Sequence, residues 1–410
     1  MLEYLFEQGY EIQILFIGGL TTEDSEQIKN STSLEVTPTR PPIVFTPFKK
    51  DKPSVWVRKY SKVILREALQ LLRRFPAELA WLLWRRQWAM SLRLDLALHE
   101  PKLSDFVRPG DIRQLHDVLR NWQPDVFLVE YVKLSSLVQS IPQATRTQLR
   151  VLLDAHDVVS DRRLRFHAKN VPHDIDITPA EETARLALYD AIMAIQSNDA
   201  QMFRQLQPYQ KIMVVGHAQH IKQTPLSERI PSDRVRFMFL GSDMTPNQEA
   251  AERLVYSIWP QINAQLGSLV SLSIGGKVGQ MFTGRVIPEG VRISGHIADL
   301  DLFYASHDIF LNPVAFGGGL KIKNVEALAH GLALITSPVG AEGLENNTAA
   351  FIVGENDQKL IGFAIELARD QALRNSMSNA ALDYAKQHFS GKAVYLELDQ
   401  FLSIQSGPTA

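Results

Sequence analysis

The 410-residue sequence contains no cysteine. This absence excludes disulfide bonds, thiolate metal sites and cysteine nucleophiles, and it fits a reducing cytoplasm. Long apolar runs are also absent, because the most apolar windows, such as residues 79–83 and 332–335, are far shorter than the roughly 20 residues of a membrane-spanning helix. We therefore expect neither a disulfide-stabilised secreted domain nor an integral membrane protein.

An excess of charge of one sign is missing as well. Lysine and arginine number 43 against 45 aspartate and glutamate residues, which gives a net charge of −2. No global field then steers the protein toward nucleic acid or anionic lipid. The first residues carry Glu3, Glu7 and Glu11, unlike the basic and then apolar start of a signal peptide. These features predict a cytoplasmic protein with no nucleic-acid partner.

What the sequence does contain is an alternation of short apolar runs with amphipathic segments, which is typical of βαβ units. Strands are predicted at 12–17, 43–45, 125–130, 149–157, 191–197, 211–218, 235–241, 268–276, 291–297, 308–314, 332–337 and 349–354. Helices are predicted at 111–121, 133–140, 180–189, 198–206, 246–265, 299–306, 320–330, 356–369, 371–388 and 391–404. The fold class is therefore α/β.

The alternation restarts after residues 219–232, a stretch with two prolines and no periodicity that we interpret as an interdomain linker. The sequence thus predicts two doubly wound, Rossmann-like domains facing across a cleft. The first spans residues 1–225 and the second 233–390. Residues 391–410 are expected to form a C-terminal helix that packs back on the first domain.

A run of three glycines, Gly317, Gly318 and Gly319, lies between a predicted strand and a predicted helix. Glycine lets the backbone approach a phosphate closely, and the helix N-terminus adds partial positive charge. Lys321 and Lys323 can each add a full charge, and Glu326 suits a ribose diol. A flexible turn with solvated lysines explains the same residues, but a second glycine loop at 339–343 opens on the same sheet edge and favours a ligand site.

Residues 56–98 form a basic, tryptophan-bearing helical segment, with nine basic and two acidic residues between 56 and 93. Such a segment suits the anionic inner face of the plasma membrane, where a lipid-linked acceptor is found. A helical hairpin packed on the first domain fits equally well.

Metal binding has weaker support. The Asp-x-Asp pairs at 174–176 and 299–301 are candidate ligands, but Asp299 is well placed to cap the following helix. His167 and His173 are six residues apart, which is not a recognised ligand spacing, and we expect both to be solvated. No metal site is predicted.

Residues 235–390, including ISGHIADLDLFYASHDIFLNPVAFGGGLKIKNVEALAHG, resemble the C-terminal domain of glycosyltransferase family 4 (group 1), and residues 125–218 resemble its first domain loosely. The run GGGxxxK is similar to that of one subgroup. The resemblance implies the GT-B fold, a nucleoside-diphosphate sugar bound mainly to the second domain, an acceptor bound to the first, and no cofactor or metal.

The resemblance also implies roles for individual residues. Glu326 aligns with the helix glutamate that holds the ribose, and His156 with a histidine over the reacting sugar. Lys323 joins these two as a catalytic candidate. The donor-binding set implied by the loops and the helix is Gly295, His296, Ile297, Gly317, Gly318, Gly319, Leu320, Lys321 and Glu326.

Three departures from the family pattern stand out. Gly318 replaces a common sugar-binding glutamate, so backbone N–H groups are expected to do that work. The usual basic pair after the first strand of the donor domain is absent, because that strand runs into GSDMTPN, and Lys321 or Lys323 must supply the charge. Finally, the chain starts at a helix, so the first domain is expected to lack its first strand.

The resemblance implies a retaining glycosyltransferase that transfers a sugar to a glycan or lipid-linked acceptor in surface polysaccharide biosynthesis. Two alternatives stay open. One is a different GT-B reaction, such as nucleotide-sugar 2-epimerisation. The other is a non-catalytic partner subunit, favoured by the altered basic pair and the expected loss of the first strand.

Overall fold

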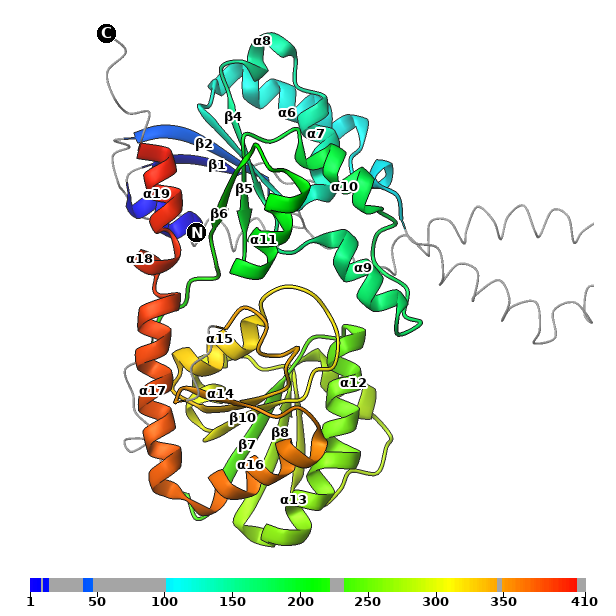
Figure 1. Ribbon diagram of the computed structural model, residues 1–410, viewed down its shortest axis with the longest axis vertical. Coiled ribbons are helices and arrows are strands. Elements are labelled where there is room, and N and C mark those ends of the chain that lie inside the picture. The colour runs from blue at the N-terminus through cyan, green and yellow to red at the C-terminus, as the bar shows by residue number, and fades with distance from the viewer. Residues whose placement is uncertain (9, 15–39, 47–100, 222–231, 345–348, 404–410) are drawn as a thin grey trace, which may run out of the picture. The chain divides into compact units, whose positions relative to one another are not determined.

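The computed structural model describes residues 1–8, 10–14, 40–46, 101–221, 232–344 and 349–403 (Figure 1). The predicted segment 56–98 lies outside these residues, and so does most of the predicted linker. The described strands form two six-stranded sheets, which confirms the α/β fold class with Rossmann-like sheets.

The first sheet has the strand order β1-β2-β3-β4-β5-β6, and the pairs β1·β2, β2·β3 and β5·β6 are parallel. Its strands are β1 (Tyr10–Ile14), β2 (Arg40–Thr46), β3 (Val126–Glu130), β4 (Arg150–Asp154), β5 (Ala191–Ala194) and β6 (Lys211–Val214). Strand β5 and the first four residues of β3 are apolar and buried, as expected of a parallel sheet covered on both faces.

The second sheet is parallel and has the order β12-β11-β10-β7-β8-β9. Its strands are β7 (Val235–Leu240), β8 (Val270–Gly275), β9 (Val291–Gly295), β10 (Ile309–Asn312), β11 (Ala333–Thr336) and β12 (Phe351–Val353). The chain builds outward on one side of β7 and then crosses to β10 on the other side. In open α/β sheets, ligands bind beyond the carboxyl ends of the strands at such a switch point.

Contacts divide the chain into two compact units. One contains residues 1–5, 154–165 and 190–410, and the other contains 6–153 and 166–189. The larger helices are α6 (Pro109–Trp122), α9 (Val159–His167), α10 (Pro179–Leu186), α11 (Ser197–Leu206), α12 (Thr245–Arg253), α13 (Trp259–Leu266), α14 (Leu300–Ala305), α15 (Ile322–Ala329), α16 (Asp357–Arg369), α17 (Gln371–Phe389) and α19 (Leu396–Ser403).

Shorter helical elements are α1 (Leu2–Glu7), α7 (Ser135–Gln139), α8 (Gln143–Arg146) and α18 (Gly391–Val394). Within the unit that contains both ends of the chain, α19 packs along β6, and the Val214 N–H donates to Glu397 Oε2 at 3.4 Å. The Tyr4 hydroxyl donates to the carboxylate of Asp399. These contacts attach the C-terminal helix to the edge strand β6 and to helix α1.

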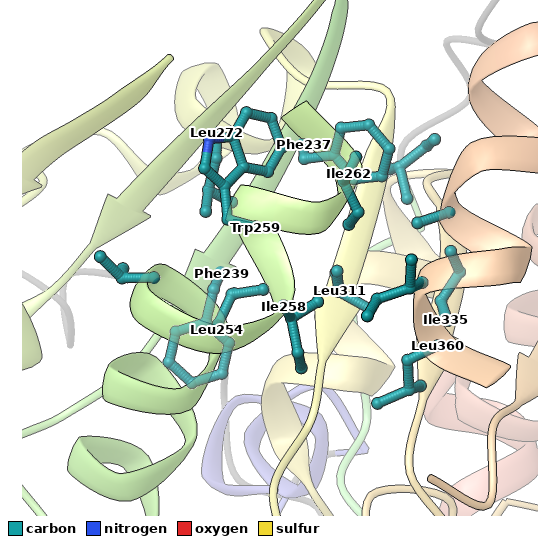
Figure 2. Close-up of a cluster of buried hydrophobic side chains, with 14 of the residues drawn as sticks. Phe237, Phe239, Leu254, Ile258, Trp259, Ile262, Leu272, Leu311, Ile335 and Leu360 are labelled. Atoms are coloured by element: carbon teal, nitrogen blue, oxygen red, sulfur yellow. The ribbon is translucent and has the colours of Figure 1, made fainter. Parts of the chain in front are cut away.

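The core of the second sheet follows the strict alternation of strand side chains. Phe237 and Phe239 pack with Leu254, Ile258 and Trp259 on one face (Figure 2). Met238, between the two phenylalanines, belongs to the cluster on the opposite face, which α14, α15 and α17 cover. Helices thus bury both faces and leave the strand ends as the places where polar loops gather.

The predicted helix 246–265 differs from the observed one in its middle. A π-helical stretch, η4 (Leu254–Ile258), separates α12 from α13, and the Trp259 N–H donates to Leu254 O. Pro260 explains this difference, because its ring has no N–H and crowds the preceding turn, so the hydrogen-bond ladder widens. Helix α9, which the sequence analysis did not predict, is weakly amphipathic and follows directly on β4.

Candidate functional site

The helices that follow the two central strands touch at the switch point of the second sheet. Lys323, in the first turn of α15, donates from Nζ to Oδ1 of Asn247 in α12. The same ammonium lies 4.8 Å from the centre of the Phe239 ring. A Cβ built on Gly317 would lie 3.8 Å from Pro246 Cγ, at the start of α12. The glycine run therefore sits where the fold predicts a ligand.

Lys323 is a partly buried lysine whose ammonium contacts an amide and an aromatic ring. Its pKa is lowered to about 7, mainly by burial and also by the charge of Lys321, while Glu326 opposes both effects. Its hydrogen-bond partner among the described residues is the amide of Asn247 rather than a carboxylate. An arriving anion would therefore meet a lysine whose charge is not already neutralised by a hydrogen-bonded partner.

The glycine run adopts backbone conformations and close contacts that disfavour residues with a side chain. Gly317 has φ 122° and Gly319 has φ 65°, both in the region that favours glycine. A Cβ on Gly318 would come 3.2 Å from Arg162 Cβ, and one on Gly319 would come 3.1 Å from His156 O. The first and third glycines, with their positive φ, thus set the path of the loop, and all three lie close to neighbouring atoms.

The carbonyl oxygens of all three glycines accept hydrogen bonds from cationic side chains. Arg165 Nη1 donates to Gly317 O at 3.3 Å, and Lys321 Nζ donates to Gly318 O at 3.4 Å and to Gly319 O at 2.7 Å. Each of these carbonyls shares a peptide bond with the N–H of the next residue, and these N–H groups belong to Gly318, Gly319 and Leu320. Within the described residues these N–H groups donate to no carbonyl or side chain. Adjacent N–H groups without an acceptor are the kind of feature from which proteins build anion-binding nests.

Lys321 is tied to its own loop and to the second glycine loop. Its Nζ lies 3.4 Å from Glu342 Oε2, and its side chain is only 10% exposed. Burial lowers the pKa of Lys321, while Glu342 raises it. Glu342 Oε1 lies 2.5 Å from Arg165 Nη1, so this carboxylate holds both cations. The positive charge of Lys321 is thus already paired.

Glu326 lies one turn further along α15, facing α14. Tyr304 donates its hydroxyl to Glu326 Oε2 at 2.6 Å, and Tyr304 stacks on His330 with ring centroids 4.6 Å apart. His330 Nε2 is 2.9 Å from Asp301 Oδ1. Burial raises the pKa of Glu326, and the Tyr304 bond, His330 and Lys323 oppose that effect. One carboxylate oxygen is therefore fixed in place by a buried tyrosine.

The predicted base-binding residues lie at the end of β9. Gly295 has φ 63°, and its carbonyl accepts from the Gly276 N–H at 2.6 Å. A Cβ on Gly276 would come 2.3 Å from Gly241 O, so the ends of β7, β8 and β9 lie side by side. His296 is exposed and Ile297 is partly buried.

His156 follows β4 and belongs to the same compact unit as the glycine run. It has a φ of 60°, which is uncommon for a residue with a side chain, and its Nε2 lies 3.7 Å from Asp154 Oδ2. Its carbonyl borders Gly319. His217, after β6, has a pKa lowered by burial and by the charge of His156. The structure thus brings the backbone of His156 next to the glycine run.

A buried amide network supports the two glycine loops. Asn324 Oδ1 accepts from Asn312 Nδ2 at 2.8 Å, and Asn324 Nδ2 donates to Gly340 O at 2.8 Å and to Thr336 Oγ1 at 3.2 Å. These bonds join β10, α15 and β11. The first and second glycine loops are therefore held by a fully buried side chain of α15.

The candidate metal motifs behave as ordinary structural residues. Asp299 Oδ1 accepts from the Leu302 N–H at 2.9 Å, which confirms its role as a helix cap. The expectation that His173 is solvated was wrong: it is 4% exposed, and Phe166 packs against its ring at 5.3 Å. His167 is exposed. No group of metal-binding side chains occurs among the residues that the structure describes.

Comparison with solved structures identifies the fold as GT-B, that of two-domain glycosyltransferases. Anabaena HepE in complex with UDP is 12% identical and has a TM-score of 0.58, with 96% of this chain and 100% of that chain covered. TarM is 7% identical with a TM-score of 0.58. The match to TarM covers 72% of this chain and 58% of TarM. These identities show a shared fold.

The sequence comparisons point in the same direction. Residues 234–370 match the family described as "Glycosyl transferases group 1". A segment of 98 residues is 24% identical to an uncharacterized 44.6 kDa protein in the cps region of Klebsiella pneumoniae. That segment covers 24% of this chain and 25% of the relative, so the likeness spans about a quarter of each. Nowhere in the described ranges is a helix both long and apolar enough to cross a membrane.

Sequence reasoning missed four side chains at the site: Asn247, Tyr304, Glu342 and Arg165. Glu342 lies in the second glycine loop, which the sequence did single out. Asn247 and Arg165 are far in sequence from the glycine run, and Tyr304 lies on the preceding helix α14. No local pattern distinguishes these three side chains.

Proposed function

We propose that this protein is a retaining glycosyltransferase that uses a nucleoside-diphosphate sugar and needs no metal ion. The observation that carries the proposal is the row of N–H groups at Gly318, Gly319 and Leu320, which have no acceptor among the described residues and lie at a switch point beside Lys323. Such a row suits the diphosphate of the donor.

The proposed roles follow from the geometry. Glu326, with Oε2 held by Tyr304, accepts hydrogen bonds from the ribose hydroxyls through its other oxygen. Gly295, His296 and Ile297 border the base. The diphosphate leaves as the bond from the anomeric carbon to the phosphate oxygen breaks. The acceptor oxygen bonds to that carbon on the same face, and its hydroxyl passes its proton to the departing phosphate oxygen. The N–H groups and Lys323 stabilise the charge that develops on the diphosphate.

His156 is proposed to lie over the reacting sugar. The acceptor is proposed to be a growing glycan or a lipid-linked sugar of a surface polysaccharide, in keeping with the cps-region setting of the Klebsiella relative. UDP is the first nucleotide to test, because the structure of Anabaena HepE holds UDP.

The test is calorimetric titration with UDP, GDP and dTDP, followed by an assay for nucleoside diphosphate released from the matching sugar donor. Glu326→Gln should weaken nucleotide binding at least about tenfold, since a charge-assisted hydrogen bond contributes about 1.5–3 kcal/mol. Glu366→Gln, an exposed carboxylate on α16, is the matched control and should bind as the wild type does. Wild-type protein that binds none of the three nucleotides contradicts the proposal.

A non-catalytic partner subunit is the second candidate. It is favoured by the pairing of Lys321 with Glu342, which leaves Lys323 as the lysine available for a diphosphate, and by the absence of a carboxylate at Gly318. Nucleotide binding without turnover, in the presence of a membrane extract that contains acceptors, would favour this second function.

A further inference from the structure

We infer that Lys321, Glu342 and Arg165 are positioning residues that aim the backbone N–H groups of the glycine run at the donor diphosphate. The inference rests on the proposed function and adds three residues with a role other than direct contact. It assigns Lys321 a part different from that of Lys323, although the two are separated by one residue.

The first step is the orientation of the peptides. In a planar trans peptide, the carbonyl of one residue and the N–H of the next point in opposite directions. Arg165 fixes the carbonyl of Gly317, and Lys321 fixes those of Gly318 and Gly319. Each of the three N–H groups of the same peptides must then point away from the cation that holds its carbonyl.

The second step concerns conformational freedom. A glycine run can rotate its peptides readily, because no Cβ restricts φ. Without external contacts, the N–H groups would sample many directions, and ordering them on binding would cost conformational entropy. Three hydrogen bonds from two cations remove that freedom in advance. The run is therefore preorganised rather than flexible.

The third step concerns Glu342, which makes the arrangement possible. Two cations beside one loop repel each other, and each would turn toward any anion that approached. Glu342 Oε1 lies 2.5 Å from Arg165 Nη1, and Oε2 lies 3.4 Å from Lys321 Nζ. The carboxylate thus holds both cations on the carbonyl side of the loop, and the N–H side stays open to the diphosphate.

The positioning role and direct charge pairing predict opposite changes in UDP affinity when Glu342 is replaced by glutamine. If Lys321 bound the diphosphate through its ammonium, Glu342 would compete with the ligand, and Glu342→Gln would tighten UDP binding. If Lys321 positions the loop, Glu342→Gln removes the charge that holds Lys321 on the carbonyl side and weakens UDP binding. Arg165 keeps a second partner, since its Nε lies 2.7 Å from Asp161 Oδ2. One substitution therefore separates the two roles.

The experiment measures the Kd of UDP and of uridine for the full-length wild type, Glu342→Gln, Lys321→Met and Arg165→Met. Each variant should bind UDP about tenfold more weakly, because small misplacements of binding groups have effects of that size. Uridine, which lacks the diphosphate, should bind all four proteins alike. Loss of selectivity for UDP over uridine is a result that a general loss of stability does not produce.

Arg236→Ala is the matched control. Arg236 makes a bidentate pair with Asp308, with Nη2 to Oδ1 at 2.8 Å and Nε to Oδ2 at 3.0 Å, at the amino end of β7, away from the glycine run. This variant should lower the melting temperature and leave the Kd of UDP unchanged. Tighter UDP binding by Glu342→Gln, or unchanged binding by Lys321→Met, would overturn the inference. Wild-type protein that fails to bind UDP, GDP and dTDP would instead remove the proposed function beneath it.

Discussion

Replacing Lys323 by methionine should stabilise the ligand-free protein and weaken its affinity for UDP. Burial lowers the pKa of Lys323 to about 7 from an ordinary 10.5. Because one pKa unit corresponds to about 1.4 kcal/mol, holding this ammonium charged costs at most about 5 kcal/mol. The side chain is partly exposed, so solvent screening reduces that cost to roughly half.

The stability gained by removing the charge is partly offset by the loss of two favourable contacts of Lys323. The hydrogen bond to Asn247 and the contact with the Phe239 ring each contribute about 0.5–1 kcal/mol, and methionine makes neither. We therefore expect Lys323→Met to raise the free energy of unfolding by about 1 kcal/mol at pH 7. Thermal unfolding followed by circular dichroism should show a melting temperature higher by about 2–4 °C.

The effect should depend on pH with a definite sign. The folded pKa of Lys323 lies below the unfolded one, so the unfolded chain binds the extra proton between about pH 7 and 10.5. The cost is complete below pH 7 and disappears as the pH rises through that range. The advantage of Lys323→Met should therefore shrink from pH 7 to pH 10. A variant less stable than the wild type at pH 7, with a difference independent of pH, would refute the reasoning.

UDP binding should take up protons through the same residue. A diphosphate beside Lys323 raises its pKa again, so at pH 8 the wild type should bind UDP together with a fraction of a proton, and its affinity should fall as the pH rises above 7. Calorimetry in two buffers of different ionisation enthalpy measures this uptake. Proton uptake that persists in a nucleotide-binding Lys323→Met variant would assign it to another group.

Two further substitutions test the supports of the site. Tyr304→Phe removes the hydroxyl that donates to Glu326 Oε2 at 2.6 Å. This variant should raise the pKa of Glu326 further and weaken UDP binding about threefold to tenfold. Titration with UDP across pH 5–8 measures both effects, and an unchanged pH profile would contradict this. Gly319→Ala forces a side chain into φ 65° and 3.1 Å from His156 O, so it should cost about 1–3 kcal/mol of stability and weaken UDP binding. Gly362→Ala, in α16 with no atom near its built Cβ, is the control and should not lose stability.

The sequence predicted the second sheet well, because each of its strands is a short apolar run closed by a turn. It placed the helix after the glycine run within two residues of α15 (Ile322–Ala329), since that helix carries its own amphipathic pattern. The π-helical stretch before Pro260 was less accessible, because a proline inside a periodic segment predicts a disturbance but not its form. His173 was misjudged for a related reason: its burial comes from Phe166, a contact that spacing does not encode.

At the candidate site, too, features within one stretch of sequence could be predicted, whereas contacts between distant stretches could not. Glycine spacing and the position of Lys321 and Lys323 could be seen in the sequence, and both lysines were equally good sources of charge. Their difference arises from Glu342, about twenty positions further along the chain, and from Asn247, more than seventy positions before them. A charge pattern cannot say which lysine is already paired, since pairing depends on which loops the sheet brings together.

The two lysines therefore act in complementary ways. Lys321 sits beside Glu342, so its positive charge is satisfied before any ligand arrives and its ammonium serves to hold carbonyl oxygens. Lys323 sits beside an amide and an aromatic ring, so its charge is costly in the free protein and becomes favourable when an anion arrives. The free energy recovered at Lys323 on binding adds to the N–H contacts that Lys321 has already ordered. Placing a carboxylate beside Lys323 would stabilise the free protein but remove this gain; in the structure the side chain at that place is the neutral amide of Asn247.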